Sequence, residues 1–174
     1  QAVDSDATGD LRVEANAHLA REAEDWDRLL AGNAPLTIPA HTRRRVIVDL
    51  GNYYCAYPVL TLSGGRDAAV RIHWAESLFE QPKAAPGTWS APKGNRDAIE
   101  GKLFAGVGDT FIHDGADCRR YEPFWWEAGR YLEILVTTAA APLVIDRFEL
   151  LETHYPYAFT GRFDADEPCG LVPD

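Results

Sequence analysis

The 174-residue sequence contains no methionine, has only three cysteines and is short of positive charge. It opens on Gln1 without an initiator methionine, so we expect a processed secreted protein or a piece of a longer chain. This favours a secreted or periplasmic location. The formal net charge of −10 argues against nucleic acids and anionic membranes as partners, because both demand basic patches.

Long apolar runs and metal-ligand motifs are also missing. No apolar run reaches the length of roughly 20 residues that spans a bilayer. Cys55, Cys118 and Cys169 are spaced too widely for a zinc site or a disulfide framework. Free thiols are favoured, although a single Cys55–Cys118 bridge stays open because sequence does not show proximity. No histidine belongs to a ligand motif, so we expect no metal and no cofactor.

Hydrophobic residues make up 46% of the chain and aromatic residues 11%, which predicts a globular domain. Residues 1–35 form a polar tail followed by an amphipathic helix. Between residues 11 and 31, four apolar side chains recur at helical spacing, and Gly32 marks the end. The expected buried face of this helix consists of Leu19, Ala23, Trp26 and Leu30.

After Pro35 the pattern changes to the two-residue period of strands. Many short strands with regular turns predict an all-β fold, an antiparallel β-sandwich of jelly-roll type with a short N-terminal helix. Residues 81–95, rich in proline and glycine, are expected to form a long loop. The expected strands are 44–50, 58–62, 69–74, 103–112, 119–124, 131–137, 143–151 and 155–163.

Four segments carry short motifs in a fixed order, within residues 36–60, 70–78, 106–115 and 121–136. Together they resemble the β-sandwich, concanavalin-like domain of bacterial α-L-rhamnosidases, which are multidomain glycoside hydrolases. Each motif alone is weak, but their order and spacing are more specific. The motif residues are Asp49-Leu50-Gly51, Glu76, Asp109-Thr110-Phe111, Glu122-Pro123-Phe124 and Arg130-Tyr131.

The resemblance implies a sandwich domain over residues 36–165 and a tail, 166–174, that leads toward a catalytic domain outside this sequence. Residues 154–168 are similar to the segment that enters the family's large α-helical barrel. In that family the general acid and base lie on the barrel, so the resemblance implies no catalytic residue here. The expected function is a non-catalytic accessory module that packs on the catalytic domain and contacts carbohydrate.

Glu76 and Arg130 lie on expected strands beside aromatic residues. We expect them to form a structural ion pair, because a half-buried carboxylate on a sheet needs a cationic partner. The alternative is that they shape a neighbouring sugar site. Phe124, Arg130 and Tyr131 are interpreted as strand residues that define the fold.

Exposed tryptophans make good platforms for sugar rings. Trp125 and Trp126 are adjacent, so in extended backbone one is expected in the core and the other in contact with a partner. Trp89, in the proline-rich loop, is a second platform or a plug over the sheet end. Planar hydrogen bonds to sugar hydroxyls are expected from Asn95, Arg96 and Asp97, unless these side chains only cap the loop.

Three functions remain open at this stage: the accessory module, a free-standing carbohydrate-binding module, and a purely structural domain whose aromatic residues face a partner. They differ in what the exposed aromatic side chains contact. A calcium site at Asp114 and Asp117 is a further alternative, but a hairpin turn explains the same residues more simply.

Overall fold

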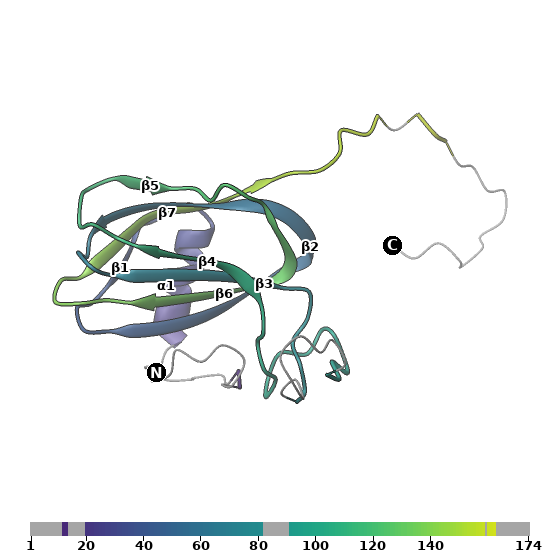
Figure 1. Cartoon of the computed structure of the whole chain (residues 1–174), viewed down its shortest axis with the longest axis horizontal. Coiled ribbons are helices and arrows are strands. Elements are labelled where there is room, and N and C mark those ends of the chain that lie inside the picture. The colour runs from purple at the N-terminus through teal and green to yellow at the C-terminus, as the bar shows by residue number, and fades with distance from the viewer. Residues whose placement is uncertain (1–11, 14–19, 82–90, 159, 163–174) are drawn as a thin grey trace.

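The computed structural model describes residues 12–13, 20–81, 91–158 and 160–162, which form a mostly antiparallel β-structure with one helix (Figure 1). Among these residues, no helix is long and apolar enough to cross a membrane. The elements are α1 (Ala20–Leu30), β1 (Leu36–Ile38), β2 (Arg43–Gly64), β3 (Ala69–Ala75), β4 (Val107–Ile112), β5 (Arg119–Tyr121), β6 (Glu127–Thr137) and β7 (Leu143–Glu152).

The long strand β2 belongs to both layers of a sandwich. Its first half pairs with β6, which continues through β3 to β4 in one layer. Its second half pairs with β7 on one edge and with β5 on the other, and β1 completes this layer beyond β7. The strand order is therefore β1-β7-β2-β6-β3-β4, with β5 beside β2. The predicted fold class, an antiparallel β-sandwich with a short N-terminal helix, is confirmed.

The sequence predicts two strands, 44–50 and 58–62, where the structure has the single strand β2. The residues expected to form a turn are instead an irregularity within the strand, since the register with β6 shifts between Asp49 and Tyr54. Gly51 has φ +74°, a conformation that glycine adopts without strain, and its N–H donates to Asp49 Oδ1 at 2.8 Å. The chain thus changes layers without ending its strand.

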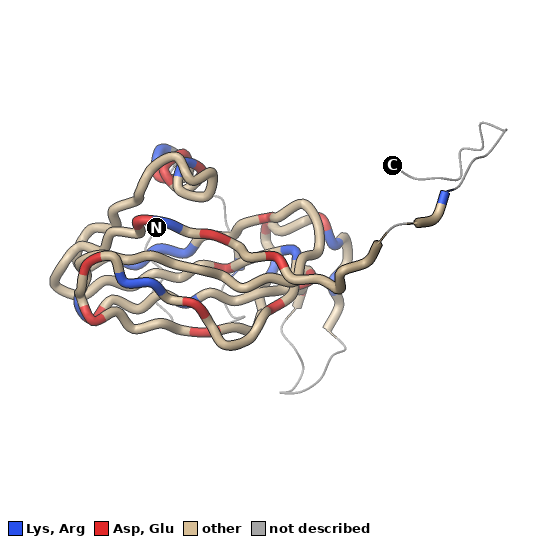
Figure 2. Tube along the Cα trace, turned by 90° about the horizontal axis from the view of Figure 1, so that it is seen from above, with Lys and Arg blue, Asp and Glu red and all other residues tan. Residues whose placement is uncertain are grey.

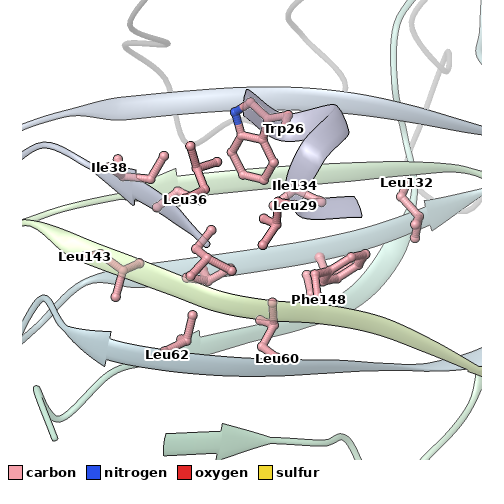
Figure 3. Packing of buried hydrophobic residues seen from close by; sticks show 14 of the residues in the cluster. Trp26, Leu29, Leu36, Ile38, Leu60, Leu62, Leu132, Ile134, Leu143 and Phe148 are labelled. Atoms are coloured by element: carbon pink, nitrogen blue, oxygen red, sulfur yellow. The ribbon is translucent and has the colours of Figure 1, made fainter. Parts of the chain in front are cut away.

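The main core lies between the two layers and is closed on one side by α1 (Figure 3). Val70, Ile72 and Trp74 point into it from β3, as their alternation predicts. Trp26 and Leu29 bring α1 into the same core, and Glu22 of α1 accepts hydrogen bonds from Nε of Arg44 at 2.6 and 2.8 Å. The helix therefore contributes to the core and is also tied to β2.

A second, smaller core covers the opposite face of the β6–β3 layer. Here Tyr131 packs with Leu78 and Phe104 from the segment that connects β3 to β4. Glu133, two residues after Tyr131 on β6, faces the same side of the layer, and only 2% of its side chain is exposed. It accepts hydrogen bonds from Arg45 at 2.6 Å and Arg71 at 2.8 Å, which compensate its burial. Both faces of β6 are consequently buried.

Several local expectations need correction. The buried helix face contains Trp26 and Leu29, whereas Ala23 is exposed, and Leu19 lies outside the described residues. Residues 155–158 and 160–162 of the last expected strand are not in a strand. Cys55 and Cys118 are free, so the optional bridge does not form. Cys169 falls outside the described part of the chain.

Candidate functional site

The connection from β5 to β6 presents three consecutive aromatic side chains to solvent. Phe124 is fully exposed, Trp125 is 69% exposed and Trp126 is 38% exposed. The two indole rings stack with centroids 6.2 Å apart and planes inclined by 23°. The expectation that one tryptophan is buried is wrong, and Phe124 is not a strand residue, because β5 ends at Tyr121. Residues 122–126 leave the ladder, so strict alternation does not apply to them.

Further exposed apolar side chains lie at the same end of the molecule. Ala56 of β2 pairs with Glu127 on one edge and Glu152 on the other, so the starts of β6 and of the C-terminal segment flank the same point of β2. Figure 1 shows the β5–β6 connection and the exit of the chain from β7 at this end. The aromatic surface, as we name it, comprises Phe124, Trp125, Trp126, Leu151, Tyr155 and Tyr157.

Tyr155 and Tyr157 are 71% and 72% exposed, and their rings contact each other at a centroid distance of 4.8 Å. Large aromatic side chains that stay in water forfeit the free energy that burial supplies. Exposed aromatic side chains gathered at one end of a domain are typical of a surface that meets a partner or a ligand.

The predicted ion pair between Glu76 and Arg130 is wrong, because each of the two residues pairs with other side chains. Glu76 accepts a hydrogen bond from Lys93 at 2.9 Å and another from Arg96, and these contacts, Lys93 first, hold its pKa below the usual range. Arg130 binds Asp49 and Asp97 instead. Glu76 is thus satisfied by the loop that covers the β6–β3 layer, and Arg130 by this loop and by Asp49 of β2.

Asn95, Arg96 and Asp97, which the sequence suggests as ligands for sugar hydroxyls, form hydrogen bonds and ion pairs within the protein instead. Asn95 Oδ1 accepts the N–H of Asp97 at 3.0 Å, Asp97 pairs with Arg130, and Arg96 pairs with Glu76. The carbonyl of Arg96 accepts the Tyr131 hydroxyl at 2.9 Å. These contacts favour the loop-capping interpretation of 95–97. Trp89 lies outside the described residues.

Two carboxylates that sequence reasoning did not single out as a pair meet at the open edge between the layers. Asp109 is paired with Ile72 and Glu127 with Ala56, and both of these neighbours are core residues, so the carboxylates share the inner faces of the two layers. Tyr121 stacks on Phe111 at 4.7 Å and is hydrogen-bonded to Asp109.

Burial and the charge of Asp109 shift the pKa values of Glu127 and Tyr121. Burial, then Asp109, raises the pKa of Glu127, and the same two causes raise the pKa of Tyr121 to about 12. A phenol that stays protonated beside a carboxylate can donate, and both carboxylates can accept, which suits hydroxyl-bearing ligands. The sequence singled out Asp109 only as part of the Asp109-Thr110-Phe111 motif, and nothing in its spacing linked it to Glu127.

Asp114, a residue of the alternative calcium site, stabilises a turn instead. Asp114 Oδ1 accepts the N–H of Ala116 at 3.0 Å, and this bond is the first cause of the lowered pKa of Asp114. Its other oxygen pairs with Arg119 at 3.1 Å. Within the described ranges, no group of three His, Cys, Asp or Glu residues is placed to hold a metal ion.

Charges of both signs are interspersed along the tube in Figure 2, without a large area of one sign. Comparison with known proteins adds no assignment: no protein-family model matches the chain, and no curated protein is significantly similar to it.

Proposed function

We propose that this chain is a non-catalytic accessory β-sandwich module of an α-L-rhamnosidase-like glycoside hydrolase, which packs on a helical catalytic domain of the same polypeptide. The observation that carries the proposal is the aromatic surface, which lies where the chain leaves β7. A surface beside the exit of the chain is the first to meet whatever the polypeptide builds next. The motif order described above supplies the family, by resemblance alone.

The geometry of the β5–β6 connection supports a packing role. Phe124 exposes its whole side chain and Trp125 more than two thirds of it, which is costly on a surface that stays in water. Interfaces between proteins are enriched in tryptophan, tyrosine and phenylalanine, and these residues often dominate the binding energy. Trp125 and Tyr155 are therefore proposed as anchors of the interdomain contact.

A double variant, Trp125→Ser with Trp126→Ser, tests the packing role on the isolated chain. We expect the wild type to self-associate or to bind a hydrophobic dye through the uncovered surface, and the double variant to lose most of that signal. The matched control is Ile112→Ser, which removes an apolar side chain that is 60% exposed on β4, at the end of the molecule where β6 finishes. A wild type that stays monomeric and binds no dye would count against the proposal.

The second candidate is a free-standing carbohydrate-binding module. It is favoured by the exposed face of Trp125 and by Glu127, which follows the tryptophan pair directly and lies near Asp109. An indole platform beside carboxylate acceptors suits a sugar ring with an apolar face and free hydroxyls. Titration calorimetry with rhamnose and rhamnose-bearing glycans decides it, with Trp125→Ala as the variant. Absence of heat for every sugar removes this candidate.

A further inference from the structure

A cavity of ≈ 270 Å³ opens at the end of the molecule that carries the aromatic surface. Its lining consists of Leu50, Tyr54, Ala56, Leu150 and Glu152. Ala56 belongs to the main core, and Leu50 and Leu150 pack against that core, so the apolar floor of the cavity is the end of the core itself. Glu152 is the one charged side chain in the lining.

Two glutamates flank Ala56 on the same face of the sheet. Ala56 pairs with Glu127 of β6 on one edge of β2 and with Glu152 of β7 on the other. Side chains of directly paired residues point to the same face, and Ala56 is buried in the main core, so both carboxylates border the inner face. Two strand spacings place the Cα atoms of the glutamates roughly 10 Å apart, with only the methyl group of Ala56 between them.

These two carboxylates are left without a partner, whereas the others on the same strands are satisfied. Those with a printed hydrogen bond or ion pair on β2, β6 and β7 are Asp49, Glu133, Asp146 and Glu149. Within the described part of the chain, neither Glu127 nor Glu152 has a hydrogen bond or ion pair to its side chain. Two negative charges therefore stay uncompensated where the core meets solvent, and the ligand that complements them is a cation.

The cavity also offers an aromatic ring to a cation. Tyr54, two residues before Ala56 on β2, lines the cavity together with Glu152. The negative face of an aromatic ring attracts cations, and arginine is the side chain that most often uses this contact. Its planar guanidinium can bind carboxylates through several N–H groups, while its alkyl stem covers apolar surface such as that of Leu50 and Leu150. A neutral sugar would leave both glutamates uncompensated.

We propose that the helical domain that covers the aromatic surface contributes an arginine, whose side chain fills this cavity. The alkyl stem lies against Leu50 and Leu150, and the guanidinium binds Glu152 and Glu127 across Ala56. Arginine is enriched together with tryptophan and tyrosine at protein interfaces, which agrees with its place beside the aromatic surface. This inference rests on the proposed packing function, because it names one contact that the covering domain makes.

The probe is N-acetyl-arginine N-methylamide, titrated into the isolated chain by calorimetry and by NMR. The citrulline analogue is the matched control, since its planar group has the same shape but no charge. We expect the arginine analogue to bind about tenfold more tightly than the citrulline analogue. Its NMR shifts should be confined to residues around the cavity, with Glu127 and Glu152 among them. Equal binding of the two analogues overturns the inference.

The protein variants are Glu152→Gln and Glu149→Gln, which remove one charge each from the same strand. Glu152 lines the cavity, whereas Glu149 is paired with Arg147 at 2.8 Å and, at odd spacing from Glu152, faces the other side of β7. We expect Glu152→Gln to weaken binding of the arginine analogue about threefold and Glu149→Gln to leave it nearly unchanged. Equal effects of the two variants contradict the assignment.

The whole polypeptide separates this inference from the packing function. There the cavity is already filled, so the arginine analogue should not bind. Undiminished binding in the whole polypeptide overturns the inference. If oxidation shows Trp125 protected there while the isolated chain does not prefer the arginine analogue, the packing function stands and the arginine contact fails. If the isolated chain prefers the arginine analogue but Trp125 stays unprotected in the whole polypeptide, the packing function fails, and the arginine contact with the covering domain fails with it.

Discussion

The guanidinium of Arg130 donates two hydrogen bonds to the carboxylate of Asp49, from Nε at 2.8 Å and from Nη2 at 2.9 Å. Its remaining nitrogen bonds to Asp97, so one side chain joins β6, β2 and the covering loop. Replacement by lysine keeps the charge but loses the planar fork. Arg130→Lys is expected to lower the unfolding temperature modestly and to increase proteolysis within residues 91–105. Arg120→Lys, at an exposed pair with Glu122, is the control.

The pairing with Arg130 holds the pKa of Asp49 below its ordinary value of 3.8. A depressed carboxyl pKa stabilises the fold above the unfolded value, and the contribution disappears as pH falls through the folded pKa. We therefore expect Asp49→Asn to be less stable than the wild type at pH 6 to 7, with the difference shrinking as pH falls below the ordinary carboxyl pKa of 3.8. Urea unfolding at several pH values measures this, and a constant difference down to pH 2 would contradict it.

Glu133 is buried between Arg45 and Arg71, and its removal leaves two arginines without their carboxylate. Breaking a buried ion pair by deleting one partner costs about 3–5 kcal/mol. Glu133→Ala should lose roughly this much free energy of unfolding. Glu122→Ala, at a pair exposed to solvent, should change it by less than about 1 kcal/mol. Denaturant titrations compare the two variants, and similar losses would contradict the buried triad.

Trp26 is 3% exposed and brings α1 into the main core. Trp26→Ala should lower the free energy of unfolding by about 3–5 kcal/mol, because removal of the indole would leave a cavity between α1 and the strands β1 and β7. Asp27→Ala, one residue further on the exposed side of the same helix, should cost less than about 0.5 kcal/mol. If both variants unfold alike, α1 is not part of the core.

Burial, and then the charge of Asp109, raises the pKa of Glu127 above its ordinary value of 4.5. A raised carboxyl pKa means that the folded state binds the proton more tightly, so stability falls as pH rises from the unfolded to the folded pKa. Glu127→Gln removes this penalty and should be more stable than the wild type at pH 7. The advantage should fade below about pH 4. A variant that is less stable at neutral pH would refute the assignment.

Periodicity predicted most of the sandwich because inward residues such as Val70, Ile72 and Trp74 alternate strictly. It divided β2 in two because Gly51 and Asn52 look like a turn, whereas a bonded bulge lets the strand continue. Glu76 and Arg130 were recognised as charges that need partners. Their actual partners, Arg96 in the covering loop and Asp49 on β2, are brought close only by the fold, and sequence spacing carries no signal for such contacts.

The exposure of the aromatic surface also could not be predicted from the sequence pattern. Alternation placed one of Trp125 and Trp126 in the core, but alternation applies only to residues inside a ladder, and β5 ends at Tyr121. The aromatic composition of the segment was visible in the sequence. Its exposure, and its place at the same end of the molecule as Tyr155 and Tyr157, became apparent only once the register placed Ala56 between Glu127 and Glu152.

The central claim is that the aromatic surface packs on a helical domain of the same polypeptide. Hydroxyl-radical footprinting of Trp125 and Tyr155 tests it most directly, with the isolated chain compared with the whole polypeptide that its gene encodes. Ile112, 60% exposed on β4 at the end of the molecule where β6 finishes, is the internal control. We predict strong protection of Trp125 and Tyr155 in the whole polypeptide and none at Ile112. Equal oxidation of Trp125 in both samples would contradict the claim.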